Sequence, residues 1–217
     1  MKRSFLSFCL VLIFGSSLVH AKDSNQYGFK FGVGFSSASI TDESNQLNRN
    51  EFTYRIGPNF GVFMYWFHHN NFQLYSELEY QARGSKERIQ VIVEPDMPTN
   101  LFVTQDNLFE YLSFSSGIQL TPFNEKLPLF INTGFSLNYL LRNDSGFGEL
   151  NFDIHRLVLS WEIGAGVVLT KLKSGKVFVS INYEPDITNA VVNDNALPAE
   201  IRVKHHLLSV AVGLLLP

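Results

Sequence analysis

Apolar and polar side chains alternate along most of this chain, and the pattern is clearest over residues 72–84. Even positions there carry Phe, Leu, Ser, Leu, Tyr and Ala, whereas odd positions carry Gln, Tyr, Glu, Glu, Gln and Arg. Successive side chains of a strand point to opposite faces, so the segment predicts a strand with one apolar and one polar wall. Residues 55–67 alternate similarly, and residues 68–71 form a short break. Together these segments predict a long antiparallel hairpin.

The same unit repeats along the chain. Alternation predicts eight strands, which are residues 27–40, 55–67, 72–93, 107–121, 128–142, 152–170, 176–187 and 201–216. Long loops are predicted at residues 41–52, 94–106, 143–151 and 188–200, and short turns at residues 68–71, 122–127 and 171–175. Eight antiparallel strands with alternating long and short connections predict an all-β, up-and-down transmembrane β-barrel.

Alternation is also found in soluble barrels, which turn the apolar face inward. The predicted strands reach about 10–14 residues, above the ~5–6 usual in globular proteins and enough for a tilted span of ~9–11 residues. Outer-membrane barrels have short periplasmic turns and long external loops, which matches the spacing here. These features favour a membrane barrel, and a soluble periplasmic barrel that binds an apolar ligand stays as an alternative.

The polar face combines glycines with charged residues of both signs. An eight-stranded barrel has an interior just wide enough for side chains to fill, so glycines there would leave room for long charged groups. We therefore expect an internal network of ion pairs, formed by Lys30, Glu77, Glu79, Arg83, Arg142, Arg156, Glu162 and Glu184.

Aromatic residues occur near the ends of several predicted strands. Outer-membrane barrels carry aromatic girdles at both membrane interfaces. We assign such interface positions to Tyr27, Trp66, Phe72, Tyr80 and Tyr183.

The first residues resemble an export signal. Lys2 and Arg3 precede an apolar segment, and a small-x-small pattern ends at Ala21. We expect a signal peptide at residues 1–21 and one barrel domain at residues 22–217. The single cysteine, Cys9, lies in that signal, which excludes metal–thiolate sites and cysteine nucleophiles from the mature chain. The net charge of −3 argues against nucleic acid as a partner.

Candidate chemistry is sparse. Glu77 and Glu79 share one face and could form an acid–base pair, but interior ion pairing is the favoured interpretation. Adjacent histidines at residues 68–69 and 205–206 point to opposite faces of a strand, so turn or rim histidines are favoured over a metal site. Residues 193–195 lack the glycine and glutamate of an EF-hand. We predict no catalytic, cofactor or metal site, and no enzymatic activity.

One known family shares residues with this chain. Residues 57–63 (Gly-Pro-Asn-Phe-Gly-Val-Phe), residues 72–84, Glu110-Tyr-Leu112 and Tyr183 before a turn resemble the signature of the PorT-like outer-membrane β-barrels of Bacteroidetes-type bacteria. The resemblance implies an eight-stranded barrel in the outer membrane. Some members of that family serve protein secretion and gliding.

Three functional hypotheses remain from the sequence. The first is a non-enzymatic, monomeric barrel in outer-membrane lipid, whose external loops bind a surface ligand or a protein partner, including secretion machinery. Loops held by a rigid scaffold commonly carry function. The second is a small pore or transporter, and the third is the soluble periplasmic barrel.

Overall fold

The computed structural model describes residues 25–42, 51–69, 71–94, 97–121, 128–145, 153–172, 175–193 and 201–216. The predicted signal peptide lies outside these residues. No helix in this part of the chain is long and apolar enough to cross a membrane. Its strands are β1 (Gln26–Asp42), β2 (Glu51–His69), β3 (Phe72–Glu94), β4 (Met97–Leu120), β5 (Leu129–Asp144), β6 (Asp153–Ile154), β7 (Leu157–Leu172), β8 (Gly175–Pro185), β9 (Val191–Asn193) and β10 (Ile201–Leu215).

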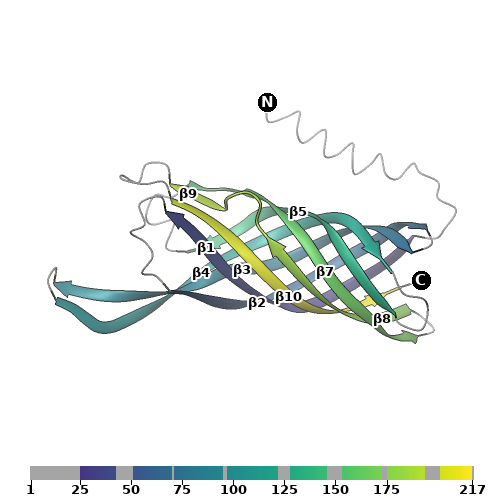
Figure 1. Ribbon diagram of the computed structural model, residues 1–217, viewed down its shortest axis with the longest axis horizontal. Coiled ribbons are helices and arrows are strands. Elements are labelled where there is room, and N and C mark those ends of the chain that lie inside the picture. The colour runs from purple at the N-terminus through teal and green to yellow at the C-terminus, as the bar shows by residue number, and fades with distance from the viewer. Residues whose placement is uncertain are drawn as a thin grey trace, which may run out of the picture.

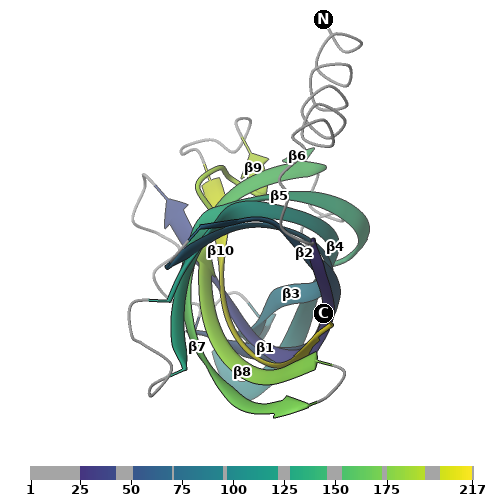
Figure 2. The same ribbon diagram turned by 90° about the vertical axis from the view of Figure 1, so that its right-hand side faces the viewer.

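Eight of the described strands close into a ring. Their order is β1-β2-β3-β4-β5-β7-β8-β10, and β1 pairs antiparallel with β10 to complete it. Figure 2, which looks along the barrel, shows this ring end on. The short strands β9 and β6 pair beside β10, beyond the end of β8. The predicted eight-stranded antiparallel barrel is confirmed.

The loop predicted at residues 94–106 is wrong in its extent. β3 pairs with β2 as far as Arg88, and β4 pairs with β5 from Leu108, but β3 and β4 continue to pair with each other up to Glu94 and Met97. The result is a two-stranded hairpin that projects beyond the ring (Figure 1). Two prolines and several polar residues in this segment favour a loop, but cross-strand pairing overrides that composition.

Two other boundaries also differ from the prediction. The strand predicted at residues 152–170 is interrupted at His155 and Arg156, which separates β6 from β7. The loop predicted at residues 188–200 contains β9. Both differences lie at the long-loop end, where β9 pairs with β6 and β10.

Gly84 lies where the hairpin leaves the ring. It has a φ of 140° and pairs with Leu108, the residue at which the pairing of β4 with β5 stops. A Cβ atom at this position would lie 1.8 Å from the carbonyl oxygen of Asn107. Only glycine therefore fits this conformation and close approach.

The outer wall is apolar and the inner wall is polar. Phe31 is 61% exposed and Val62 is 58% exposed, whereas Lys30 and Arg83 are buried. A soluble barrel would turn its apolar wall inward, so this wall suits hydrocarbon. Other exposed apolar residues include Val33, Phe60, Leu78, Phe114, Ile118, Ile131, Phe135, Leu141, Trp161, Ile163, Leu169, Ile181, Leu208 and Val212.

Among the described residues, two apolar clusters lie inside the barrel, one towards each end. The cluster at the short-turn end consists of Phe63, Phe130, Phe178 and Leu215. The cluster at the long-loop end consists of Ala38, Phe109, Tyr111, Val158, Ala190, Val191 and Val203. The polar side chains in between are thereby separated from the solvent at both ends.

We predict that Val33→Arg destabilises the barrel by about 2–4 kcal/mol, because it places a guanidinium group in hydrocarbon near the middle of the wall. The measurement is urea-induced unfolding of the protein in lipid vesicles. Val103→Arg is the matched control, since Val103 is exposed on the projecting hairpin and pairs with Ile89, and it should leave the unfolding free energy within about 0.5 kcal/mol. Equal losses in both variants would contradict a lipid-facing position for Val33.

Candidate functional site

Charged residues of the barrel interior are the candidate site. Six of the eight residues expected there are buried within the ring, namely Lys30 on β1, Glu77, Glu79 and Arg83 on β3, Glu162 on β7 and Glu184 on β8. They share the inward face because each occupies the polar phase of the alternation. Asp186 and His205 are also buried there, although the sequence analysis did not assign them.

The first group of contacts surrounds Lys30. Its ammonium nitrogen lies 2.7 Å from Oε1 of Glu77 and 3.4 Å from Oε2 of Glu79. Asn59 donates a hydrogen bond of 2.9 Å to the other oxygen of Glu79. Lys30 on β1 therefore forms ion pairs with two carboxylates of β3.

Glu162 faces this group from β7. Asn132 donates to its Oε1 at 3.0 Å, and the hydroxyl of Tyr75 donates to its Oε2 at 3.4 Å. The small cavity between Glu162, Glu77 and Lys30 has a volume of about 30 Å³, which is room for about one water molecule.

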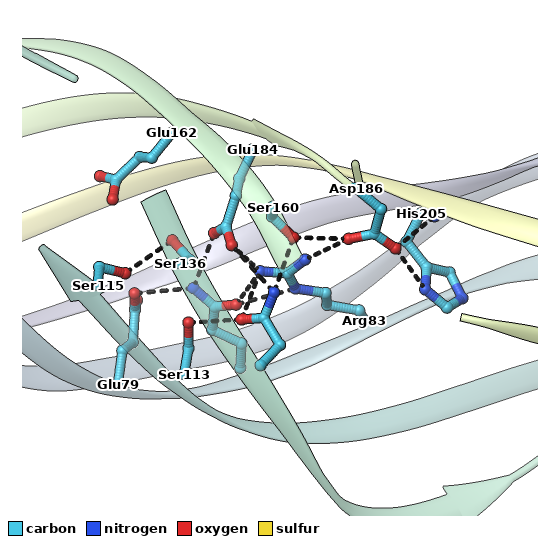
Figure 3. Close-up of polar contacts among 12 residues, drawn as sticks. Glu79, Arg83, Ser113, Ser115, Ser136, Ser160, Glu162, Glu184, Asp186 and His205 are labelled. Atoms are coloured by element: carbon cyan, nitrogen blue, oxygen red, sulfur yellow. Dashed lines mark hydrogen bonds and ion pairs between the residues drawn. The ribbon is translucent and has the colours of Figure 1, made fainter. Parts of the chain in front are cut away.

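The second group surrounds Arg83 (Figure 3). Arg83 follows Glu77 and Glu79 along β3, so this group lies closer to the long-loop end. Its guanidinium pairs with Glu184 and lies 3.1 Å from Oδ1 of Asp186. Asp186 also accepts hydrogen bonds from the hydroxyl of Ser160 and the backbone N–H of His205, each at 2.8 Å. The Nδ1 atom of His205 lies 3.3 Å from Oδ2 of Asp186.

Neutral amides connect the two groups. Gln81 donates to Glu79 at 2.9 Å and to Glu184 at 3.2 Å, and it accepts a hydrogen bond of 2.9 Å from Arg83. Asn138 accepts from Ser113 at 2.6 Å and donates to Ser160 at 2.7 Å. Figure 3 shows Glu79 and Ser113 on one side of this group and Glu184 and Ser160 on the other. The network therefore ties strands together across the interior as well as around the ring.

Carboxyl groups outnumber permanent cations in this network. Within the part of the interior that the structure describes, five buried carboxyl groups, those of Glu77, Glu79, Glu162, Glu184 and Asp186, face Lys30 and Arg83. Among the described residues, no group of three or more His, Cys, Asp or Glu side chains is arranged to hold a metal ion. The arrangement is suited to cross-linking the walls of the barrel.

Arg142 and Arg156 are corrections to the expected interior network. Tyr111 pairs with Leu140 but Glu110 pairs with Arg142, so β5 has one extra residue at this point. Such a β-bulge reverses the alternation beyond it, and Arg142 lies on the outside with a side chain 61% exposed, 3.3 Å from Asp144. Arg156 lies at the break between β6 and β7 and is exposed.

His205 and Asp186 could have been found by extending the alternation. His205 is an even number of residues from Ser209 on β10, and Asp186 is two residues from Glu184. Each therefore points to the same inward face as that neighbour. The interpretation of His205 as a rim residue is wrong, because its side chain is 1% exposed and packs against Phe109, with ring centroids 4.7 Å apart. Its neighbour His206 points outward instead.

The aromatic residues assigned to membrane interfaces lie at different levels of the wall. Tyr27, Trp66 and Phe72 lie near the short-turn end, at the ends of β1, β2 and β3. Tyr80 stacks on Phe60 with centroids 4.9 Å apart, further towards the long loops. Tyr183 lies further towards the long loops as well and is 42% exposed. Their role in interfacial girdles stays a prediction.

We predict that Arg83→Met lowers the unfolding free energy by about 3–5 kcal/mol, because it leaves Glu184 and Asp186 buried without their cation. Arg142→Met is the matched control, and the loss of its exposed pair with Asp144 should cost about 0–1 kcal/mol. Urea-induced unfolding in lipid vesicles measures both. A loss below about 1 kcal/mol for Arg83→Met would contradict a structural role for the network.

Comparison with known proteins gives similarities of fold at low sequence identity, and no curated protein matches. OprG from Pseudomonas aeruginosa has 10% identity and a TM-score of 0.49, over 88% of this chain and 96% of OprG. Ail of Yersinia pestis has 13% identity and a TM-score of 0.38, over 88% of this chain and 99% of Ail. Neisserial surface protein A has 12% identity and a TM-score of 0.43, with the same coverage of both chains.

A family model extends over most of the sequence. The outer membrane protein beta-barrel domain matches residues 21–191, a region that includes β1 to β8 of the described structure. A barrel in the outer membrane requires an apolar outer wall and keeps its charged side chains inside, as this structure does. The alternative of a soluble periplasmic barrel is therefore wrong. The chain belongs to the outer membrane protein beta-barrel domain family and is a protein of the outer membrane.

Proposed function

We propose that this outer-membrane barrel is a non-enzymatic structural or binding protein that acts through its long-loop end. The observation that carries the proposal is the β3–β4 hairpin, which extends beyond the ring. The resemblance of residues 57–63 and 72–84 to PorT-like barrels supports a partner in a protein-secretion system. From the same residues we also propose that the chain belongs to the PorT-like branch of the family.

The hairpin has the properties of a docking element. In the described pairings, β3 beyond Arg88 and β4 from Met97 to Gln105 form ladder hydrogen bonds only with each other. A two-stranded hairpin alone is marginally stable in water, and free strand edges are templates for pairing with an added strand. Near its base, Val103 is 57% exposed, and the guanidinium of Arg88 lies 4.1 Å from the ring centroid of Phe102.

The filled interior supports a binding role over a transport role. The ion-pair network bridges opposite walls, and the apolar cluster around Phe63 and Phe178 lies between it and the short-turn end. The cavity of about 30 Å³ beside Lys30 is too small for a solute larger than water. Buried carboxylates engaged with Lys30 and Arg83 also support a non-enzymatic role.

A small pore is the competing function, and conductance separates the two. We expect the purified barrel to give no stable current steps in a planar lipid bilayer, under salt and voltage at which a porin conducts readily. The physical reason is the side-chain packing between opposite walls. Reproducible single-channel steps from the heat-modifiable, folded protein would favour the pore.

Photocrosslinking in living cells tests the docking role of the hairpin. With a photoreactive residue in place of Val103, we expect a protein adduct of defined mass. The matched control is the same residue in place of Ile163, which is exposed on the lipid-facing wall and should give no such adduct. The absence of a protein adduct from Val103, or the same adduct from both positions, would contradict the proposal.

A further inference from the structure

An apolar hollow lies on the outer wall of the barrel, towards the long-loop end. It has a volume of about 580 Å³ and is lined by Phe35, Tyr54, Ile56, Tyr183 and Leu208 around Ser37. This volume lies in the ~300–1,000 Å³ range of small-molecule sites. The hollow exists because the small side chain of Ser37 lies between larger neighbours on β2 and β10.

A polar edge closes the hollow on the side of the long loops. His206 lines the hollow and pairs with Ser37 across β1 and β10. Its Nδ1 atom lies 3.1 Å from the hydroxyl of Tyr183, and its Nε2 atom lies 3.1 Å from the hydroxyl of Ser39. The imidazole is held in place by these two partners, so the border between apolar and polar surface is fixed.

Two cations continue the same face beyond His206. Lys204 pairs with Ser39 and Arg202 pairs with Thr41, and both share the outward phase of β10 because Val203 and His205 are buried. Each step of two residues moves ~7 Å along the strand. The ammonium of Lys204 donates to the carbonyl oxygen of Ile187 at 2.7 Å, and its two further protons allow a second acceptor.

We propose that this hollow binds one lipid of the outer leaflet, with an acyl chain against Ser37 and an anionic phosphate headgroup on Lys204. The order of surfaces along β10 matches the order of groups in such a lipid: hydrocarbon, then a polar border, then negative charge. Arginine and lysine form strong, charge-assisted hydrogen bonds with phosphate oxygens. Long-loop ends of outer-membrane barrels face the cell exterior, which places the site in the outer leaflet.

Charge complementarity selects a lipid over a second copy of this chain. Two barrels that met hollow to hollow would bring the ammonium group of Lys204 of one close to the same group of the other. Like charges at such an interface oppose association. An anionic lipid removes this repulsion and fills the hollow at the same time.

Native mass spectrometry of the folded barrel in detergent tests the inference. The probes are phosphatidylglycerol and phosphatidylcholine with identical acyl chains, added at equal concentration. We expect one molecule of phosphatidylglycerol to be retained in preference to phosphatidylcholine. Lys204→Gln should reduce that preference about five-fold, the effect of about 1 kcal/mol for one cation near an anionic lipid. Ser37→Phe should reduce retention of both lipids, because it fills the hollow.

The matched controls lie elsewhere on the outer wall. Lys171→Gln removes an exposed cation at the short-turn end of β7, and Ala165→Phe adds the same ring at an exposed position of that strand; both should retain lipid as the unaltered barrel does. Equal retention of the two lipids by the unaltered barrel would overturn the inference. So would unchanged lipid selectivity in Lys204→Gln, or a dimer of the chain that Ser37→Phe abolishes. A heat-dependent shift in electrophoresis verifies the fold of each variant, and if Ser37→Phe does not fold, Lys204→Gln decides the outcome.

Discussion

The pairing of β1 with β10 is the interaction on which the rest of this structure depends. Hydrocarbon offers no hydrogen-bond partners to a polypeptide backbone, so every N–H and C=O group within it must be paired inside the protein. β1 and β10, the first and last strands of the ring, pair from Gly28 opposite Leu215 to Asp42 opposite Ile201. This pairing leaves no sheet edge within the ring. Closure with only eight strands keeps the barrel radius small, and the interior is therefore narrow.

The narrow interior explains both the composition of the inner wall and its network. Gly32 and Gly164 occupy positions where a Cβ atom would collide with the amide groups of Asn59 and Asn182. Charged groups that enter so small a space have protein partners in place of water, as Lys30 and Arg83 do. Removing one partner leaves an uncompensated buried charge, so a shifted register that separated these partners would be disfavoured.

The fold could be read from the sequence because the period of two is strong and the two walls differ in chemistry. Lys30, Glu77 and Arg83 were placed correctly by phase alone. Phase counting fails where the chain gains a residue: the bulge opposite Glu110 moves Arg142 to the outer wall. Composition fails in residues 97–106, where Pro98 and several polar residues lie within a paired strand. The outer hollow has no linear signature, because it depends on side chains that four strands bring together.

The closing seam also sets the order of events in assembly. Gly28 and Leu215 belong to strands at opposite ends of the described sequence, whereas the β2–β3 and β3–β4 pairs join neighbouring segments. Pairing between distant segments carries the larger loop-closure entropy and is intrinsically slow. Hairpins of neighbouring strands can therefore form before the whole chain has reached the membrane, but the ring cannot close until β10 is present. Until then the chain carries two unpaired strand edges, and this interval is when it most needs protection from aggregation.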